Sequence, residues 1–134
     1  MKNLFLLRHA KSSWDNAALA DFDRPLSKRG ISNAILLSEH IQKHDITFDL
    51  VLSSPSERTQ STLDLVLSSL DHFPTTTLKE SIYHASPSSL AQLIKEQDDE
   101  INNLLVIGHN PGLHILAETL TNQSIVKFPT CTFA

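Results

Sequence analysis

The stretch NLFLLRH (residues 3–9) decides the fold class, because a short apolar run ends abruptly in an arginine and a histidine. An uninterrupted apolar run of this length is typical of a strand in a parallel sheet that is buried on both faces. It is far shorter than the roughly 20 apolar residues of a membrane-spanning helix and than the core of a signal peptide. We therefore predict a strand over residues 3–7, with Arg8 and His9 at its carboxyl end.

Strand and helix patterns alternate along the rest of the chain. Helical spacing covers residues 31–44, and further helices are predicted to open at Ser54, Ser86 and Asn110. Strands are predicted at residues 48–52, 75–78, 104–107 and 126–133. This alternation predicts an α/β protein with a mostly parallel sheet.

Capping signals mark two of the predicted helix starts. Ser54 and Glu57 form a Ser-x-x-Glu capping box with Pro55 at the first helical position. Asn110 is the expected N-cap of the helix that starts with Pro111. At the other end of the chain, Pro129 has no N–H to give to a central ladder, so residues 126–133 are predicted to form an edge strand.

Length and composition favour one domain over residues 1–134 and exclude several functions. The chain has 134 residues, of which 40% are hydrophobic, which suits one compact core. A net charge of −4 argues against a protein that wraps nucleic acid or lies on an anionic membrane. The single cysteine, Cys131, allows neither an intrachain disulfide nor a cysteine-based zinc site, and we expect it to pack as a small core residue in a cytoplasmic protein.

Polar residues follow three of the predicted strands. They are Arg8-His9, residues 53–58 and Gly108-His109-Asn110. Carboxyl ends of parallel strands form the ligand-binding edge of an open α/β sheet. Arginine forks and helix N-termini both favour phosphate, and an imidazole held through one nitrogen can attack phosphorus through the other. The sequence therefore predicts a phosphate pocket that needs no metal ion.

These motifs together resemble the histidine phosphatase superfamily, and most closely its small phosphohistidine phosphatases of the SixA type. The resemblance spans nearly the whole chain and includes Arg8-His9, Lys11 to Trp14, Asp21 to Gly30, Ser53 to Thr62, Tyr83 to Pro87, Gly108 to Gly112 and Phe128 to Thr130. It implies a phosphoglycerate mutase-like fold, a three-layer α/β/α arrangement with an antiparallel edge strand. Because the family continues beyond the last strand, we also expect a shortened C-terminus after Ala134.

The resemblance also implies the roles of individual residues. His9 would be phosphorylated, Arg8 and Arg58 would clamp the phosphoryl group, and His109 would complete the pocket without a cofactor. Lys11 and Arg24 would help to admit a phosphorylated substrate, although a loop salt bridge is an alternative role for Arg24. The implied partner is a phosphorylated protein of a phosphorelay or of a phosphotransferase system.

The general acid is the least defined role. Larger members of the superfamily carry a carboxylate after the third strand, where Glu80 is the nearest candidate and a solvated side chain is the alternative. His84 is a second candidate on the same loop. A phosphohistidine substrate makes a weaker demand, because an imidazole with a pKa of about 6.5 is a better leaving group than an alkoxide.

Three other interpretations stay open at this point. A general phosphomonoesterase or mutase would act on small phosphate esters, and a non-catalytic domain would only bind phosphate. His40 and His44, four residues apart on a predicted helix, could contact a metal ion, but no third ligand is near them in the sequence, which favours a solvated helix face.

Overall fold

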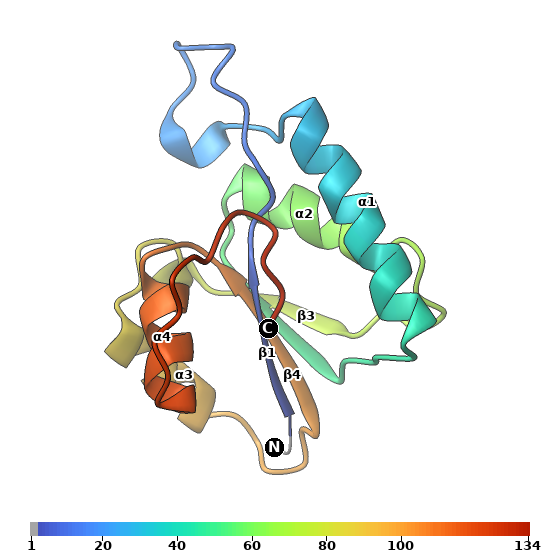
Figure 1. Ribbon diagram of the computed structural model, residues 1–134, viewed down its shortest axis with the longest axis vertical. Coiled ribbons are helices and arrows are strands. Elements are labelled where there is room, and N and C mark those ends of the chain that lie inside the picture. The colour runs from blue at the N-terminus through green and yellow to red at the C-terminus, as the bar shows by residue number, and fades with distance from the viewer. Residues whose placement is uncertain (1–2) are drawn as a thin grey trace.

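The computed structural model describes residues 3–134, in which a four-stranded parallel sheet lies between two pairs of helices (Figure 1). The strands have the order β1-β4-β2-β3, and every pair of neighbours is parallel. The elements are β1 Asn3–Arg8, η1 Asp21–Asp23, α1 Lys28–Lys43, β2 Leu50–Ser53, α2 Glu57–Leu67, β3 Thr75–Leu78, η2 Glu80–Ile82, α3 Pro87–Lys95, β4 Asn103–Gly108 and α4 Gly112–Thr121. The predicted α/β class with a parallel sheet is confirmed.

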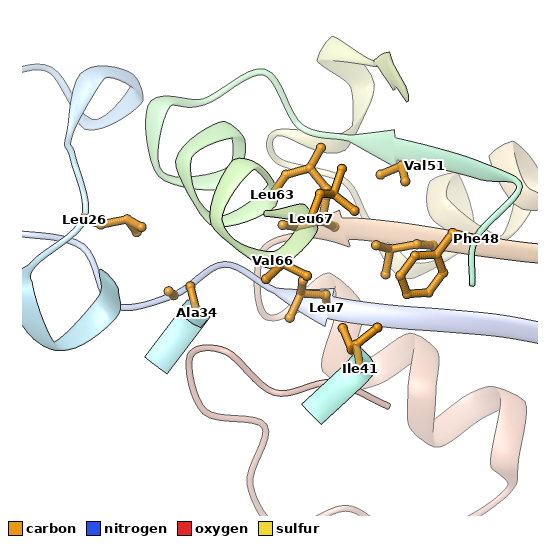
Figure 2. Close-up of a cluster of buried hydrophobic side chains, with 12 residues drawn as sticks. Leu7, Leu26, Ala34, Ile41, Phe48, Val51, Leu63, Val66 and Leu67 are labelled. Atoms are coloured by element: carbon orange, nitrogen blue, oxygen red, sulfur yellow. The ribbon is translucent and has the colours of Figure 1, made fainter. Parts of the chain in front are cut away.

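Alternate residues of the central strands point to opposite faces of the sheet and enter two separate clusters. Leu7 of β1 packs with apolar residues of α1 and α2, and Figure 2 shows this cluster. Leu6 packs on the other face with residues of α3 and α4. Leu7 is fully buried, which stabilises the fold by roughly 1.5–3 kcal/mol relative to an exposed side chain. The result is the predicted three-layer arrangement, with α1 and α2 on one side and α3 and α4 on the other.

The pairing of α1 with α2 includes a buried polar contact. Ser38 on α1 is fully buried, and its hydroxyl donates to the carbonyl oxygen of Val66 on α2 at 2.6 Å. A small residue at this position lets the two helices approach closely, and the hydrogen bond satisfies the hydroxyl that this approach buries.

The helix starts differ from three predictions. α1 begins at Lys28, earlier than predicted, because the Ser27 hydroxyl accepts from the N–H of Gly30 and caps it. The predicted capping box of α2 is wrong: the N-cap is Ser56, and the hydroxyl of Ser54 contacts His109 instead. The N-cap of α4 is Pro111, because the side chain of Asn110 donates to the carbonyl oxygen of Phe128.

The predicted edge strand over residues 126–133 is not a strand of the sheet. Only an isolated antiparallel bridge joins Leu7 to Phe133, and Ala134 exchanges backbone hydrogen bonds with Leu6. Pro129 has no N–H, and Cys131 adopts a φ of 62°, so the segment cannot continue as a regular strand. The sheet formed by the described residues is therefore entirely parallel.

No helix formed by residues 3–134 combines the length and the apolar character that crossing a bilayer requires.

Candidate active site

A cavity of about 530 Å³ opens at the carboxyl ends of β1, β4 and β2. The topology brings these three ends together, because β4 lies between β1 and β2 and all three run in the same direction. The residues that line the cavity are Arg8, His9, Lys11, Ser12, Trp14, Asp21, Arg24, Arg58, His84, His109, Asn110 and Thr130. All the predicted site residues except Glu80 are in this set, as is His84, the second candidate for the acid.

His9 is fixed with one nitrogen hydrogen-bonded and the other available. Its Nδ1 lies 2.7 Å from the carbonyl oxygen of Ala10, and a carbonyl only accepts, so Nδ1 carries the proton and Nε2 keeps its lone pair. The N–H of Ala10 in turn donates to Oγ1 of Thr62 on α2 at 2.9 Å. α2 thus holds the peptide that orients the imidazole.

The surroundings of His9 keep its ring neutral. Burial, and to a smaller extent the positive charges of Arg58, Arg8 and Arg24, together lower the pKa of His9 to about 4, against the opposing effect of the Ala10 hydrogen bond. Near neutral pH the ring is therefore uncharged. A neutral imidazole with a free Nε2 is the form that acts as a nucleophile.

His109 lies beside His9, with the two ring centroids 5.1 Å apart. Its Nε2 is 2.8 Å from the hydroxyl oxygen of Ser54, the residue that follows β2. Burial, and to a smaller extent His9 and Arg58, together lower the pKa of His109 to about 3. The second histidine is thus also neutral near pH 7 and is held by a neighbouring strand end.

The arginines surround the two histidines and are themselves held in place. Arg8 donates to the carbonyl oxygen of Phe128 at 3.1 Å, and its buried Nε has no hydrogen-bond partner among the described residues. Arg58 is 6% exposed and donates to the backbone carbonyl of Asp21 at 2.6 Å and to its carboxylate at 3.0 Å. A guanidinium group has five N–H donors, so both arginines keep donors for an anion.

Arg24 forms the loop salt bridge that the sequence suggested as an alternative role for it. It lines the cavity, and its guanidinium group also forms a salt bridge with Asp21 at 3.1 Å. Its guanidinium group also donates hydrogen bonds to the hydroxyl oxygen of Ser12 at 2.5 Å and to the carbonyl oxygen of Ser13 at 3.2 Å. These contacts hold it rigidly at the edge of the cavity.

Asp21 is the site residue that the sequence did not predict. Its carboxylate accepts hydrogen bonds from Tyr83, Arg58 and Arg24. The Tyr83 hydroxyl and the two guanidinium groups hold the pKa of this carboxyl well below its usual range, so Asp21 is ionised and cannot donate a proton. The sequence suggested a loop salt bridge for Arg24 without identifying its partner, and nothing local linked Asp21 to Arg58.

Two predicted features lie away from the cavity. Glu80 is exposed on η2 and does not line it. His40 on α1 and His44, the C-cap of this helix, are both exposed, with ring centroids 4.3 Å apart. Residues 3–134 contain no group of three histidine, cysteine, aspartate or glutamate side chains that could hold a metal ion.

The sequence is similar to a known protein family and to two uncharacterized proteins. Residues 4–85 match the model of the Histidine phosphatase superfamily (branch 1). An uncharacterized chloroplastic protein of Arabidopsis thaliana is 34% identical over 99% of the chain, which spans 65% of that protein's length. An uncharacterized protein of Mycobacterium tuberculosis is 34% identical over 88% of the chain and 72% of its own length.

Solved structures of SixA share the fold. The protein described as phosphohistidine phosphatase SixA from Agrobacterium tumefaciens superposes with a TM-score of 0.93 at 26% identity, over 100% of this chain and 90% of that one. The protein histidine phosphatase SixA in complex with tungstate gives a TM-score of 0.85 at 23% identity, over 97% of this chain and 84% of that one.

Proposed function

Because the chain belongs to the histidine phosphatase superfamily, in its SixA type, we propose that it removes the phosphoryl group from a phosphorylated protein histidine. His9 is the nucleophile, and phospho-His9 is the intermediate. The observation that carries the proposal is the state of His9: Nδ1 is bound to the Ala10 carbonyl, the ring is neutral, and Nε2 is free in a cavity lined by arginines.

The reaction has two displacements at phosphorus. In the first, Nε2 of His9 forms a bond to phosphorus while the P–N bond of the substrate breaks. The electron pair of that bond leaves with the substrate imidazole, whose other ring nitrogen carries a proton, so that the ring departs as a neutral group. Arg8 and Arg58 hold the equatorial oxygens and stabilise their charge. In the second, water attacks phospho-His9, which yields inorganic phosphate and restores the free imidazole.

The acid–base properties of the cavity favour a P–N substrate over a phosphate ester. An alkoxide must be protonated as it leaves, but Asp21 is ionised and Glu80 does not line the cavity. His84, the second candidate for the acid, does line the cavity. A leaving imidazole, with a pKa of about 6.5, depends much less on such a donor.

Lys11 and Arg24 are proposed to attract the phosphorylated substrate toward the arginines. Lys11 is exposed at the edge of the cavity, whereas Arg24 is buried and fixed. In a chain of net charge −4, four of the cationic side chains line this one cavity together with one carboxylate. The site is therefore locally positive and selects an anion.

The test is phosphate release by purified protein in excess EDTA from two substrates, a phosphohistidine-bearing protein and p-nitrophenyl phosphate. We expect turnover that survives chelation, favours the phosphohistidine protein and disappears in His9→Ala. Trapping of acid-labile, base-stable phosphate on the wild type and not on His9→Ala would identify the intermediate. Faster turnover of the ester would indicate a small-molecule phosphatase, and binding without turnover that depends on His9 would indicate a phosphate-binding domain.

A further inference from the structure

Trp14 is the most unusual surface residue near the cavity. Its side chain is 76% exposed although it is the one tryptophan of the chain. One face of the indole covers the guanidinium group of Arg24, whose central carbon lies 3.1 Å from the ring centroid. Because Arg24 is itself held by Asp21 and Ser12, the indole rests on a fixed cation and turns its other face outward.

A second aromatic side chain extends this edge of the cavity. Phe22 is 38% exposed and meets the ring of Tyr83 edge-on at a centroid distance of 5.1 Å. Tyr83 lies 5.4 Å from His109, so the aromatic contacts lead from the outer surface to the catalytic histidines. The segment between β1 and α1 that carries Trp14 and Phe22 projects from the body of the protein (Figure 1). We call Trp14 and Phe22 the aromatic rim.

We propose that the aromatic rim is the surface on which the substrate protein docks, with Trp14 as the residue that selects a phosphorylated protein over a small phosphate compound. This inference rests on the function proposed above. The cavity binds the phosphoryl group through its arginines, and the rim offers apolar surface at the outer part of the cavity wall, to which Trp14 belongs. A ligand that extends past the arginines covers more of an indole that is 76% exposed, and a protein segment on each side of a phosphohistidine does so.

The chemistry of the rim suits such a partner. The charged end of the substrate is attracted by the cavity, whereas the indole contacts the uncharged side chains around it. Tryptophan is enriched among the residues that dominate protein interfaces, because it buries a large and rigid surface. Since Arg24 already orders the ring, docking costs little conformational entropy at this position.

The kinetic test compares Trp14→Ala with Phe73→Ala on two substrates. Phe73 is a matched control, since it is 73% exposed and does not line the cavity. With a histidine-phosphorylated phosphocarrier protein as substrate, we expect Trp14→Ala to raise KM on the order of tenfold with little change in kcat. With p-nitrophenyl phosphate, Trp14→Ala should raise KM by a smaller factor, because the small ester covers less of the indole, and Phe73→Ala should behave as wild type on both substrates.

The possible failures are distinguishable. If wild-type protein does not dephosphorylate the carrier protein, the proposed function fails. If the wild type is active and Trp14→Ala matches Phe73→Ala, the function stands and the docking surface is refuted. An equal loss on both substrates would show that Trp14 only holds Arg24 in place, and it would also overturn the inference.

Fluorescence gives a direct second measurement, because Trp14 is the only tryptophan in the sequence. The His9→Ala variant, which cannot form the intermediate, is titrated with a tryptophan-free phosphocarrier protein phosphorylated on histidine. We expect a blue shift of the Trp14 emission as the exposed ring becomes buried, and none with inorganic phosphate alone. Binding without a blue shift would place the partner elsewhere on the surface.

Discussion

The buried, neutral state of His9 predicts that this residue makes the fold sensitive to mild acid. Its pKa is about 4 in the folded chain, against about 6.5 when unfolded. Between these two values the unfolded chain binds more protons, so stability rises with pH across this window and falls as the pH is lowered through it. At pH 5 nearly every unfolded His9 is protonated and few folded ones are. Going from pH 7 to pH 5 should therefore cost about 2 kcal/mol through His9 alone.

Urea unfolding followed by far-UV circular dichroism measures this quantity in wild type, His9→Gln and His72→Gln at both pH values. For m-values of about 1–3 kcal/mol per molar urea, the His9 contribution moves the midpoint by roughly 1 M. His9→Gln cannot titrate, so it should lose about 2 kcal/mol less than wild type between pH 7 and pH 5. His72→Gln, which changes an exposed histidine, should retain the wild-type loss. Equal losses in all three proteins would refute the claim that His9 is buried in its neutral form.

Two further substitutions test the site. Asp21→Asn removes the carboxylate charge that competes with phosphate for Arg58, but it leaves the backbone carbonyl that Arg58 also contacts. The inhibition constant of inorganic phosphate should therefore fall several-fold. A rise would show that the carboxylate is needed to hold Arg58. Thr62→Val leaves the N–H of Ala10 without its acceptor, which should lower the free energy of unfolding by about 1–3 kcal/mol in thermal unfolding and lower kcat. Thr62→Ser, which keeps the hydroxyl, should retain the stability and kcat of wild type. A Thr62→Val variant as active and stable as wild type would contradict the positioning of His9 by α2.

Strands β1, β2 and β4 were predictable from the sequence because their burial is local information, whereas the strand predicted over residues 126–133 did not form. The apolar run before Arg8 required a strand covered on both faces, and Leu6 and Leu7 indeed enter opposite clusters. The helix boundaries were less accurate, since capping depends on competition between hydrogen bonds. The Ser54 hydroxyl contacts His109, 55 residues away, and no local pattern could show that this partner would displace the cap.

The site was predicted where one motif supplies several residues and missed where contacts join distant loops. Arg8 ends β1 and His9 follows it directly, so the rule that ligands bind at the carboxyl ends of strands was sufficient to place them. Asp21 contributes through an approach of η1 to Arg58 and Tyr83, and its sequence neighbours carry no sign of it. Glu80 follows β3 as expected, but β3 lies at the edge of the sheet, two strands away from β4, and this order was not readable from the sequence.

In the proposed reaction, the positive charges that hold the phosphoryl group also affect the reactivity of His9. Three guanidinium groups and burial make its imidazole a weaker base than the histidine of the substrate, which by itself disfavours transfer of the phosphoryl group to it. The arginines offset this by holding the transferred oxygens, and the weak base then becomes an advantage, because a less basic imidazole leaves phosphorus more readily when water attacks. A site that takes phosphate from one imidazole and releases it to water therefore gains from a nucleophile of low pKa, provided that its proton stays on Nδ1, where the Ala10 carbonyl holds it.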